Sequence, residues 1–395
     1  MRGCPELIPL LLLASLPLTI STIGFLRSSS LSCRSNHPKH RDRRAMQRER
    51  LVDLSQDASE ETADTGARKR HKSSSPPQPC ECQPFYLLAS EPPPSTDNRR
   101  CLSMRDVIAN DDSHPIESIV LFNYLVDIDW LLDEIPLISS VPCSILHGAH
   151  HDLLSESYMD AFPLLTLAKV QVSIPYGTHH SKLGFIFYEH GMRIFIGTNN
   201  LIPVDNIYKT QGIYVQDFLL KASVSEKSSS TCDFEQDLIA YLKEIKVDKR
   251  SASQHLATAN LQSLIEQVKL YDFSAAEVVL IASVPGHHSG PNLKRWGHMR
   301  LRNILERHPL PPHFAQDCPL VLQVSSIGNA IRQHLLIYLI LPLGSMGPEE
   351  RYLEELISSL CPTTAISSGK PPVQLVWPSV DCIRESAQVL DMHSL

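Results

Sequence analysis

Two histidines and a lysine stand just before an apolar run in the segment YGTHHSKLGFIFYEHGMRIFIGTNNL, Tyr176 to Leu201. The stretches KLGFIFY and MRIFIGT are rich in β-branched and aromatic residues, and Glu189-His190-Gly191 between them predicts a tight turn. In an antiparallel hairpin whose turn is centred on His190, residue 180 faces residue 200 and residue 182 faces residue 198. We therefore expect His180 to lie beside Asn200 at the open end of the hairpin.

The three side chains at that end suit the chemistry of an anion. His180 and Lys182 are two residues apart on a strand, so they project from the same face, whereas His179 points to the other face and receives no catalytic role. An imidazole is a nucleophile or an acid–base group near neutral pH, and a lysine supplies positive charge. The Asn200 amide adds a hydrogen-bond donor. Together they suit a phosphate under attack, although such residues also occur as solvated caps at strand ends.

The pattern His180-x-Lys182 with Asn200 resembles the HxK…N motif of the tyrosyl-DNA phosphodiesterases, a family of the phospholipase D superfamily. Further segments resemble family landmarks in the family's order, and the resemblance extends roughly from Pro84 to Ser386. These segments are GTHHSK, TNNL, YKTQGIY, FNYLVDIDWL, LHG, LIASVPG, WGHMRL, VSSIG and WPSV.

The resemblance implies an α/β fold, a phospholipase D-like α/β/α sandwich of two halves that each contribute one HxK motif to a shared site. It implies that His180 attacks the phosphorus at a DNA 3′ end to give a phosphohistidine, while Lys182 and Asn200 hold the non-bridging oxygens. The family needs no metal or other cofactor, because fixed side chains supply the charge that a cation would otherwise provide.

The resemblance also implies a DNA partner: a single-stranded or 3′-terminal DNA that carries a tyrosyl or topoisomerase peptide adduct. Tyr176 stands where the family has an aromatic side chain that stacks on DNA. Ser325 and Ser326 match a segment that touches the DNA backbone, although a simple polar turn explains them equally well. Asp205 and Gln211 also match family positions. Two neighbours, Pro203 and Asn206, depart from the histidine and the aromatic residue expected there.

The chain shows no second His-x-Lys after Lys182. His298-Met-Arg300 is the nearest shape, and His37-Pro-Lys39 lies in a polar tail. Since the family's second histidine protonates the leaving tyrosine, we expect phosphate binding or slow adduct formation without turnover. We interpret the sequence as a fragment, an incorrect gene model or an inactive isoform with an incomplete second half.

Composition and hydropathy divide the 395 residues into four regions. Residues 1–26 form a hydrophobic segment, which is either a signal or anchor of about the 20 residues that span a bilayer or a wrongly assigned start. Residues 27–83 are basic and rich in Ser and Pro, which predicts disorder. Alternating strand and helix patterns then predict a first half over 84–290 and a partial second half over 291–395. Within these regions CSILHG and AKVQVSIP predict short buried strands. CDFEQDLIAYLKEIK predicts a helix with residues such as Phe234 and Leu238 on one apolar face, and NLKRWGHMRLRNILERH predicts an amphipathic, basic helix.

Charge and cysteine usage bear on location. The net charge of −7 excludes a globally basic nucleic-acid binder. The run RKRHK at Arg68–Lys72 indicates a solvated tail, a nuclear localisation signal or a phosphate-binding arm. Ten cysteines without a CxxC pair favour a reduced intracellular protein, with the CxC of Cys80 and Cys82 as a weak metal signal.

Three functions remain open on the sequence alone. The first is a nuclear DNA-repair phosphodiesterase that removes tyrosine from DNA 3′ ends. The second is a non-catalytic DNA-binding remnant or isoform of that enzyme. The third, which depends on Leu7 to Leu26, is a membrane-anchored or secretory phospholipase D-like hydrolase.

Overall fold

A computed structural model describes thirteen stretches of the chain, all of them within one compact unit that spans Met1–Ser21 and Gln83–Leu395. The predicted disordered region 27–83 lies outside the described residues, as do Tyr176, Ser325 and Ser326. The described stretches are 10–12, 84–89, 101–109, 115–149, 156–174, 177–221, 232–250, 253–276, 278–308, 320–323, 348–361, 373–376 and 379–384.

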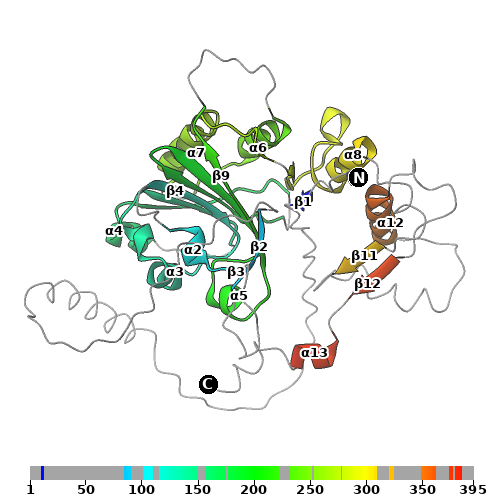
Figure 1. The fold of residues 1–395 in the computed structure, drawn as a ribbon, viewed down its shortest axis with the longest axis horizontal. Helices are drawn as coiled ribbons and strands as arrows, with labels where there is room; N and C mark the ends of the chain where they lie inside the picture. The colour runs from blue at the N-terminus through cyan, green and yellow to red at the C-terminus, as the bar shows by residue number, and fades with distance from the viewer. Residues whose placement is uncertain are drawn as a thin grey trace, which may run out of the picture. The chain divides into compact units, whose positions relative to one another are not determined.

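An eight-stranded mixed sheet dominates the described part of the chain, in the order β3-β2-β9-β8-β7-β4-β5-β6 (Figure 1). Strands β4, β5 and β6 are parallel, and β4, β7, β8, β9 and β2 pair antiparallel in turn. The bounds are β2 Phe85–Leu88, β3 Cys101–Leu102, β4 Ile116–Asn123, β5 Cys143–His147, β6 Leu165–Lys169, β7 Leu183–Tyr188, β8 Gly191–Gly197 and β9 Gly212–Leu219.

Helices cover both faces of this sheet, so the predicted α/β/α layering is confirmed for this part of the chain. Alternate residues of β7 show the two faces: Phe185 packs in one core cluster and Ile186 in the other. Helices α6 (Asp233–Glu244) and α7 (Gln254–Val268) cover the Phe185 face (Figure 1). The opposite face is covered by α2 (Met104–Val107), α3 (Ile128–Glu134), α4 (Glu156–Ala161) and the 3₁₀ helix η1 (Pro136–Ser139).

The hairpin of β7 and β8 forms as predicted, but its register differs by one residue. Leu183 pairs with Ile196 and Tyr188 pairs with Gly191, so only Glu189 and His190 form the turn. The expected pairing of 180 with 200 and of 182 with 198 is therefore wrong. Gly191 opens β8 and does not belong to the turn, because two-residue loops match the twist of paired strands best.

A second difference concerns the strand predicted in AKVQVSIP. The strand β6 lies earlier, at Leu165–Lys169, where four of its five residues are buried. Beyond it, Val170 makes a single bridge to Val247 and the chain then leaves the sheet. The β-branched residues of this run predicted a short buried strand, but the run Leu165–Lys169 just before most of it forms the pairing with β5.

The remaining described elements follow in the distal part of the chain. Strand β10 (Val279–Ile281) pairs with β1 (Leu10–Leu12), which belongs to the predicted hydrophobic segment, and β11 (Leu320–Gln323) pairs with β12 (Val373–Val376). The predicted basic helix is α8 (Gly297–Arg307), after the 3₁₀ helix η2 (Gly290–Asn292). It packs on α12 (Pro348–Leu360) through Leu301, Ile304 and Leu360, and α13 covers Val380–Arg384.

Among the residues that the structure describes, no helix combines the length and the apolar character needed to cross a bilayer.

Candidate functional site

The three predicted catalytic residues, His180, Lys182 and Asn200, lie at one edge of the large sheet. Strand β4 ends at Asn123, and because β7 runs antiparallel to it, β7 begins at the same edge. His180 and Lys182 come just before β7, and Asn200 comes three residues after β8 ends at Gly197. Polar residues at the carboxyl ends of parallel strands such as β4 are well placed to bind a ligand, because the loops there are free to diverge.

His180 and Lys182 are in direct contact, as their spacing predicts. The Lys182 Nζ lies 3.0 Å from the His180 Nδ1 and donates a hydrogen bond to the His180 carbonyl oxygen at 2.9 Å. The ring of half-buried His180 also lies against the Tyr124 ring, with centroids 4.7 Å apart and planes 30° apart. Lys182 is buried, at 6% exposure.

Burial sets the charge state of this pair. Desolvation, followed by the positive charge of Lys182, lowers the pKa of His180 from 6.5 to about 4. Desolvation also lowers the pKa of Lys182 from 10.5 to about 8, although the negative charge of Asp205 opposes the shift. Near neutral pH the imidazole is therefore uncharged, and the lysine is mostly protonated but close to its titration range.

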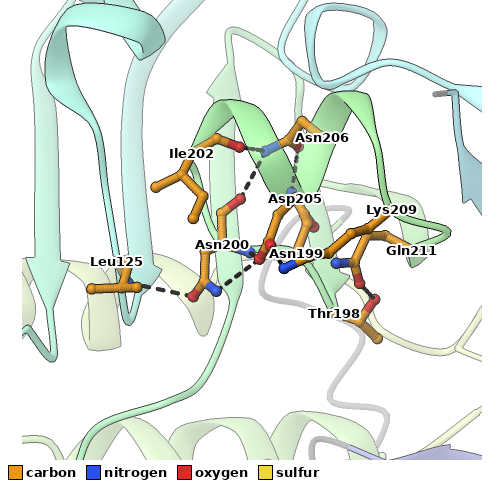
Figure 2. Close-up of polar contacts among 9 residues, drawn as sticks. All are labelled: Leu125, Thr198, Asn199, Asn200, Ile202, Asp205, Asn206, Lys209 and Gln211. Atoms are coloured by element: carbon orange, nitrogen blue, oxygen red, sulfur yellow. Dashed lines mark hydrogen bonds and ion pairs between the residues drawn. The ribbon is translucent and has the colours of Figure 1, made fainter. Parts of the chain in front are cut away.

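Asn200 is held by a network of hydrogen bonds at the start of α5 (Pro203–Ile207), as Figure 2 shows. Its backbone N and its Nδ2 donate to Asp205 Oδ2 at 2.8 and 2.7 Å. Its Oδ1 accepts from the backbone N of Leu125 at 3.4 Å. Since an amide nitrogen carries two hydrogens, the bond to Asp205 leaves Nδ2 one hydrogen with which to donate to a ligand.

His180 and Asn200 come together through β4 and not through hairpin pairing. The His180 ring lies on Tyr124, and the Asn200 carboxamide accepts from Leu125, the next residue along the chain. The segment after β8 runs beside the segment after β4, with a bridge between Val126 and Leu201. Both residues therefore lie at this edge of the sheet, but the hairpin pairing that was expected to place His180 directly opposite Asn200 does not form.

Asp205 is the buried anchor of the network, with 3% exposure. Its Oδ1 accepts from Lys209 Nζ at 2.6 Å. Burial raises the pKa of Asp205, but the hydrogen bonds from Lys209 and Asn200 together with the charge of Lys209 outweigh it, so the pKa lies below its usual value. Asp205 therefore stays ionised and holds Asn200 with charge-assisted hydrogen bonds.

Two residues that depart from the family pattern have clear structural roles. Asn206 Nδ2 donates to the carbonyl oxygens of Asn200 and Ile202, both at 2.8 Å, and its Oδ1 accepts from Asn199 (Figure 2). Pro203 occupies the first turn of α5, where the missing N–H costs no hydrogen bond.

Gln211, which matched a family position, accepts from Thr198 Oγ1 at 2.5 Å and so joins the end of β8 to the start of β9.

His179 points away from His180, as strand alternation predicts. It is buried, at 3% exposure, and its ring centroid lies 6.0 Å from that of Phe122 in the core beneath α6 and α7. Burial is the main cause that lowers the pKa of His179 from 6.5 to about 3, followed by the charges of Lys182 and His180. His179 is therefore an uncharged core residue near neutral pH.

A glycine lets the His179–Lys182 segment pass close to the end of β5. A Cβ atom at Gly148 would lie 1.9 Å from the His179 carbonyl oxygen, which is much closer than a van der Waals contact. The neighbouring Thr178 Oγ1 donates to the Gly148 carbonyl oxygen at 3.2 Å. Absence of a side chain at position 148 is thus required for the observed path of the residues before His180.

His298-Met-Arg300, the nearest shape to a second HxK motif, takes part in helix packing. His298 Nδ1 lies 3.0 Å from Ser359 Oγ of α12, and Arg300 Nη2 donates to Asp237 of α6 at 2.6 Å. Within the described stretches no group of three or more potential ligands gathers to hold a metal ion.

The fold and the site together define a mixed α/β protein with a histidine, a lysine and an asparagine at one edge of its main sheet. The model of the tyrosyl-DNA phosphodiesterase family matches residues 84–393, and the chain belongs to this family. The match covers both the residues around His180 and the distal elements.

Known relatives agree with this assignment. Tyrosyl-DNA phosphodiesterase 1 of Arabidopsis thaliana is 35% identical over 311 residues, which are 77% of this chain and 47% of the relative. The corresponding Drosophila melanogaster protein is 31% identical over 254 residues, or 62% of this chain and 41% of the relative. The chain thus spans about half the length of these curated relatives. The crystal structure of yeast tyrosyl-DNA phosphodiesterase is similar at 18% identity and a TM-score of 0.43, with 62% of this chain and 54% of that chain covered.

Proposed function

We propose that the chain acts on the phosphodiester at a DNA 3′ end, with tyrosine as the leaving group and His180 as the nucleophile. Family membership supports the substrate class. The observation that carries the chemistry is the 3.0 Å contact between the His180 Nδ1 and the Lys182 Nζ, next to a fixed carboxamide. This arrangement combines an uncharged nucleophile with fixed donors for the charge that develops on phosphate oxygens.

The reaction exchanges one bond at phosphorus for another. A nitrogen of His180 forms the P–N bond, the P–O bond to the tyrosyl oxygen breaks, and the leaving oxygen takes up a proton from water to become a phenol. Lys182 and Asn200 donate to the two non-bridging oxygens during this exchange. Because Asn200 is already oriented by Asp205 and Leu125, it loses little freedom when the phosphate arrives.

Lys182 has to change partner before His180 can attack. A protonated lysine can only donate, so the His180 Nδ1 accepts and the ring proton lies on Nε2, which leaves neither nitrogen with a free lone pair. When a phosphate oxygen takes the ammonium, the Nδ1 lone pair is released. Substrate binding itself therefore activates the nucleophile.

An activated substrate tests this proposal without a proton donor for the leaving group. A single-stranded oligonucleotide that ends in a 3′-(4-nitrophenyl) phosphate releases nitrophenolate as a stable anion. We expect a burst of up to one equivalent of nitrophenolate per chain, together with an acid-labile phosphoryl adduct on His180. Continued release after the burst would measure hydrolysis of the adduct.

The control is a matched histidine substitution. His180→Ala should abolish both the burst and the adduct, whereas His255→Ala, at an exposed position of α7, should leave them unchanged. A burst of normal size from His180→Ala would rule out this histidine as the nucleophile. Absence of a burst from the unaltered chain would leave DNA binding as its activity.

We also propose that Tyr176, Ser325 and Ser326 contact the DNA strand, as the family resemblance implies, and that the protein acts in the nucleus. The basic run at Arg68–Lys72 supports nuclear entry. Replacing that run with glutamines should shift a tagged chain from the nuclear to the cytoplasmic fraction. Recovery of the unaltered chain in a membrane pellet would contradict the nuclear assignment.

A further inference from the structure

A pocket of about 420 Å³ opens beside the residues that lead into His180. One wall is the segment Gly177–His179, and the other walls come from the end of β6 and from the residues after α6. Consecutive Cα atoms are about 3.8 Å apart, so this pocket begins within one residue of the proposed nucleophile. None of the roles proposed above uses it.

The charges that line the pocket favour an anion. Lys169, Lys249 and Arg250 contribute three positive charges, and Asp248 contributes the one negative charge among the lining residues, which leaves a surplus of two. Hydrogen bonds from Arg250 hold the pKa of Asp248 below its usual value, so this carboxylate is ionised and occupied. Asp248 thus neutralises Arg250, and the two lysines supply the surplus.

Hydrogen bonds of the backbone fix the walls of the pocket. Gln171 N donates to the Lys246 carbonyl oxygen and Asp248 N donates to the Lys169 carbonyl oxygen, both at 2.7 Å, so the residues after α6 extend the edge of the sheet. On the opposite wall, Thr178 donates to the Gly148 carbonyl oxygen. A ligand would therefore meet preformed walls of backbone and would not have to order the main chain around it.

A buried polar atom adjoins this pocket. His179 lines it, and His179 Nε2 is buried without a hydrogen-bond partner in the part of the chain that the structure describes. Buried polar atoms in folded proteins are usually paired. With the ring proton on Nε2, the uncharged imidazole would donate a hydrogen bond to an anionic oxygen bound in the pocket, which is an observation in favour of an anion that is separate from the lysines.

We propose that this pocket binds a phosphate group of the same DNA strand whose 3′-terminal phosphate is held by His180 and Lys182. The inference rests on the proposed function, because that function places the strand end at His180. The binding of a neighbouring phosphate would fix the direction in which the strand leaves the site. Phosphate contacts of this kind position a nucleic acid and carry no sequence information.

Two paired substitutions with equal charge change test the pocket. The pocket pair, Lys169→Gln combined with Lys249→Gln, removes the two surplus positive charges of the pocket. The control pair, Lys243→Gln combined with Lys269→Gln, removes two lysines at exposed positions outside the pocket. Binding is measured for three probes: a single-stranded oligonucleotide with a 3′-phosphate, thymidine 3′-phosphate and inorganic orthophosphate. The mononucleotide lacks the neighbouring phosphate and serves as the internal reference.

We expect the pocket pair to weaken oligonucleotide binding about tenfold and to reduce the slope of log affinity against log salt by roughly 0.7 for each phosphate that the protein no longer neutralises. Mononucleotide binding should stay within about twofold, because its one phosphate lies at His180. Oligonucleotide binding equal to that of the control pair would overturn the proposal. Loss of orthophosphate binding alone, with oligonucleotide binding intact, would also overturn it, because the pocket would then hold a free anion.

The nitrophenolate burst separates this inference from the proposed function. If the unaltered chain gives no burst and the pocket pair lowers oligonucleotide affinity, the inference about the pocket stands and the proposal of His180 as nucleophile fails. If the unaltered chain gives a normal burst and both pairs of substitutions bind the oligonucleotide equally well, the proposal of His180 as nucleophile stands and the inference about the pocket fails.

Discussion

The two sides of the candidate site are held in different ways. Asn200 is tied to an ionised, buried Asp205 and to the backbone of Leu125, and Asn206 holds its carbonyl oxygen. His180 is half-buried, lies against Tyr124 and is contacted by Lys182, which in the proposed reaction must leave before the imidazole attacks. The Asn200 side, which we propose holds the anion, is thus fixed in advance, whereas the proposed mechanism requires the His180 side to change partners when a phosphate binds.

The largest effect should come from breaking the preorganised side. Asp205→Ala removes the acceptor for Asn200 and Lys209 and leaves buried donors unpaired, so the free energy of unfolding should fall by about 3 kcal/mol. Lys209→Met is the control, because the Lys209 side chain is 42% exposed and its loss should cost less than about 1 kcal/mol. Urea denaturation measures both. Equal costs for the two substitutions would show that the ion pair, and not the support of Asn200, stabilises this loop.

Acid should lower the stability of the folded chain through the histidines on the His180 side of the site. The folded chain keeps His179 and His180 neutral, with pKa values of about 3 and about 4. The unfolded chain takes up protons at these residues below about pH 6.5, so it binds more protons than the folded chain. The free energy of unfolding should therefore decrease as the pH is lowered below about 6.5, by up to about 1.4 kcal/mol per pH unit for each histidine.

The acid effect is assigned by substitution. His179→Gln should flatten the dependence of the denaturation midpoint on pH between 6.5 and 4, and His255→Gln, at an exposed site, should leave it unchanged. The same slope in both variants would place the acid-sensitive group elsewhere.

A mildly alkaline pH should weaken the binding of the substrate phosphate by Lys182. Its pKa of about 8 means that the ammonium is lost as the pH rises through the mildly alkaline range. Affinity for a 3′-phosphorylated oligonucleotide should decrease about tenfold between pH 7 and pH 9, since a charge-assisted hydrogen bond becomes a neutral one. Lys182→Arg keeps its charge throughout this range and should bind with little change between the two pH values. A parallel decrease in both proteins would exclude Lys182 as the cause.

The smallest effect should come from the ring beneath the nucleophile. Tyr124→Leu removes the aromatic surface against which His180 lies, and we expect the nitrophenolate burst to slow by about two- to fivefold, because a partly exposed aromatic pair contributes about 0.5–1 kcal/mol. Tyr124→Phe keeps the ring and should retain the rate. A rate loss in Tyr124→Phe as large as in Tyr124→Leu would assign the effect to the hydroxyl group.

Local residue types were enough to predict several parts of this molecule. The hydrophobic face of residues such as Phe234 and Leu238 predicted α6, and the buried run CSILH predicted β5. The spacing of His180 and Lys182 predicted their contact, because two residues on an extended segment always share a face. Features set by neighbours in sequence were therefore predictable.

Features set by distant partners were not. The register of the hairpin depended on whether Gly191 closes the turn or opens β8, and either choice satisfies the same residue types. Helix α7 was not predicted, because exposed Leu256 accompanies its buried leucines and weakens the periodic pattern. The role of Asp205 required knowing that Lys209 and Asn200 point toward the same carboxylate.

The close approach at Gly148 has a consequence for genetic variation. Every missense change of a glycine codon introduces a Cβ atom, and here that atom would lie 1.9 Å from the carbonyl oxygen of His179, one residue before the proposed nucleophile. A shift of about 1 Å at a reacting group can cost about 100-fold in rate. Inherited substitutions at this codon, however conservative in size, should therefore behave as loss-of-function alleles for the chemistry of His180.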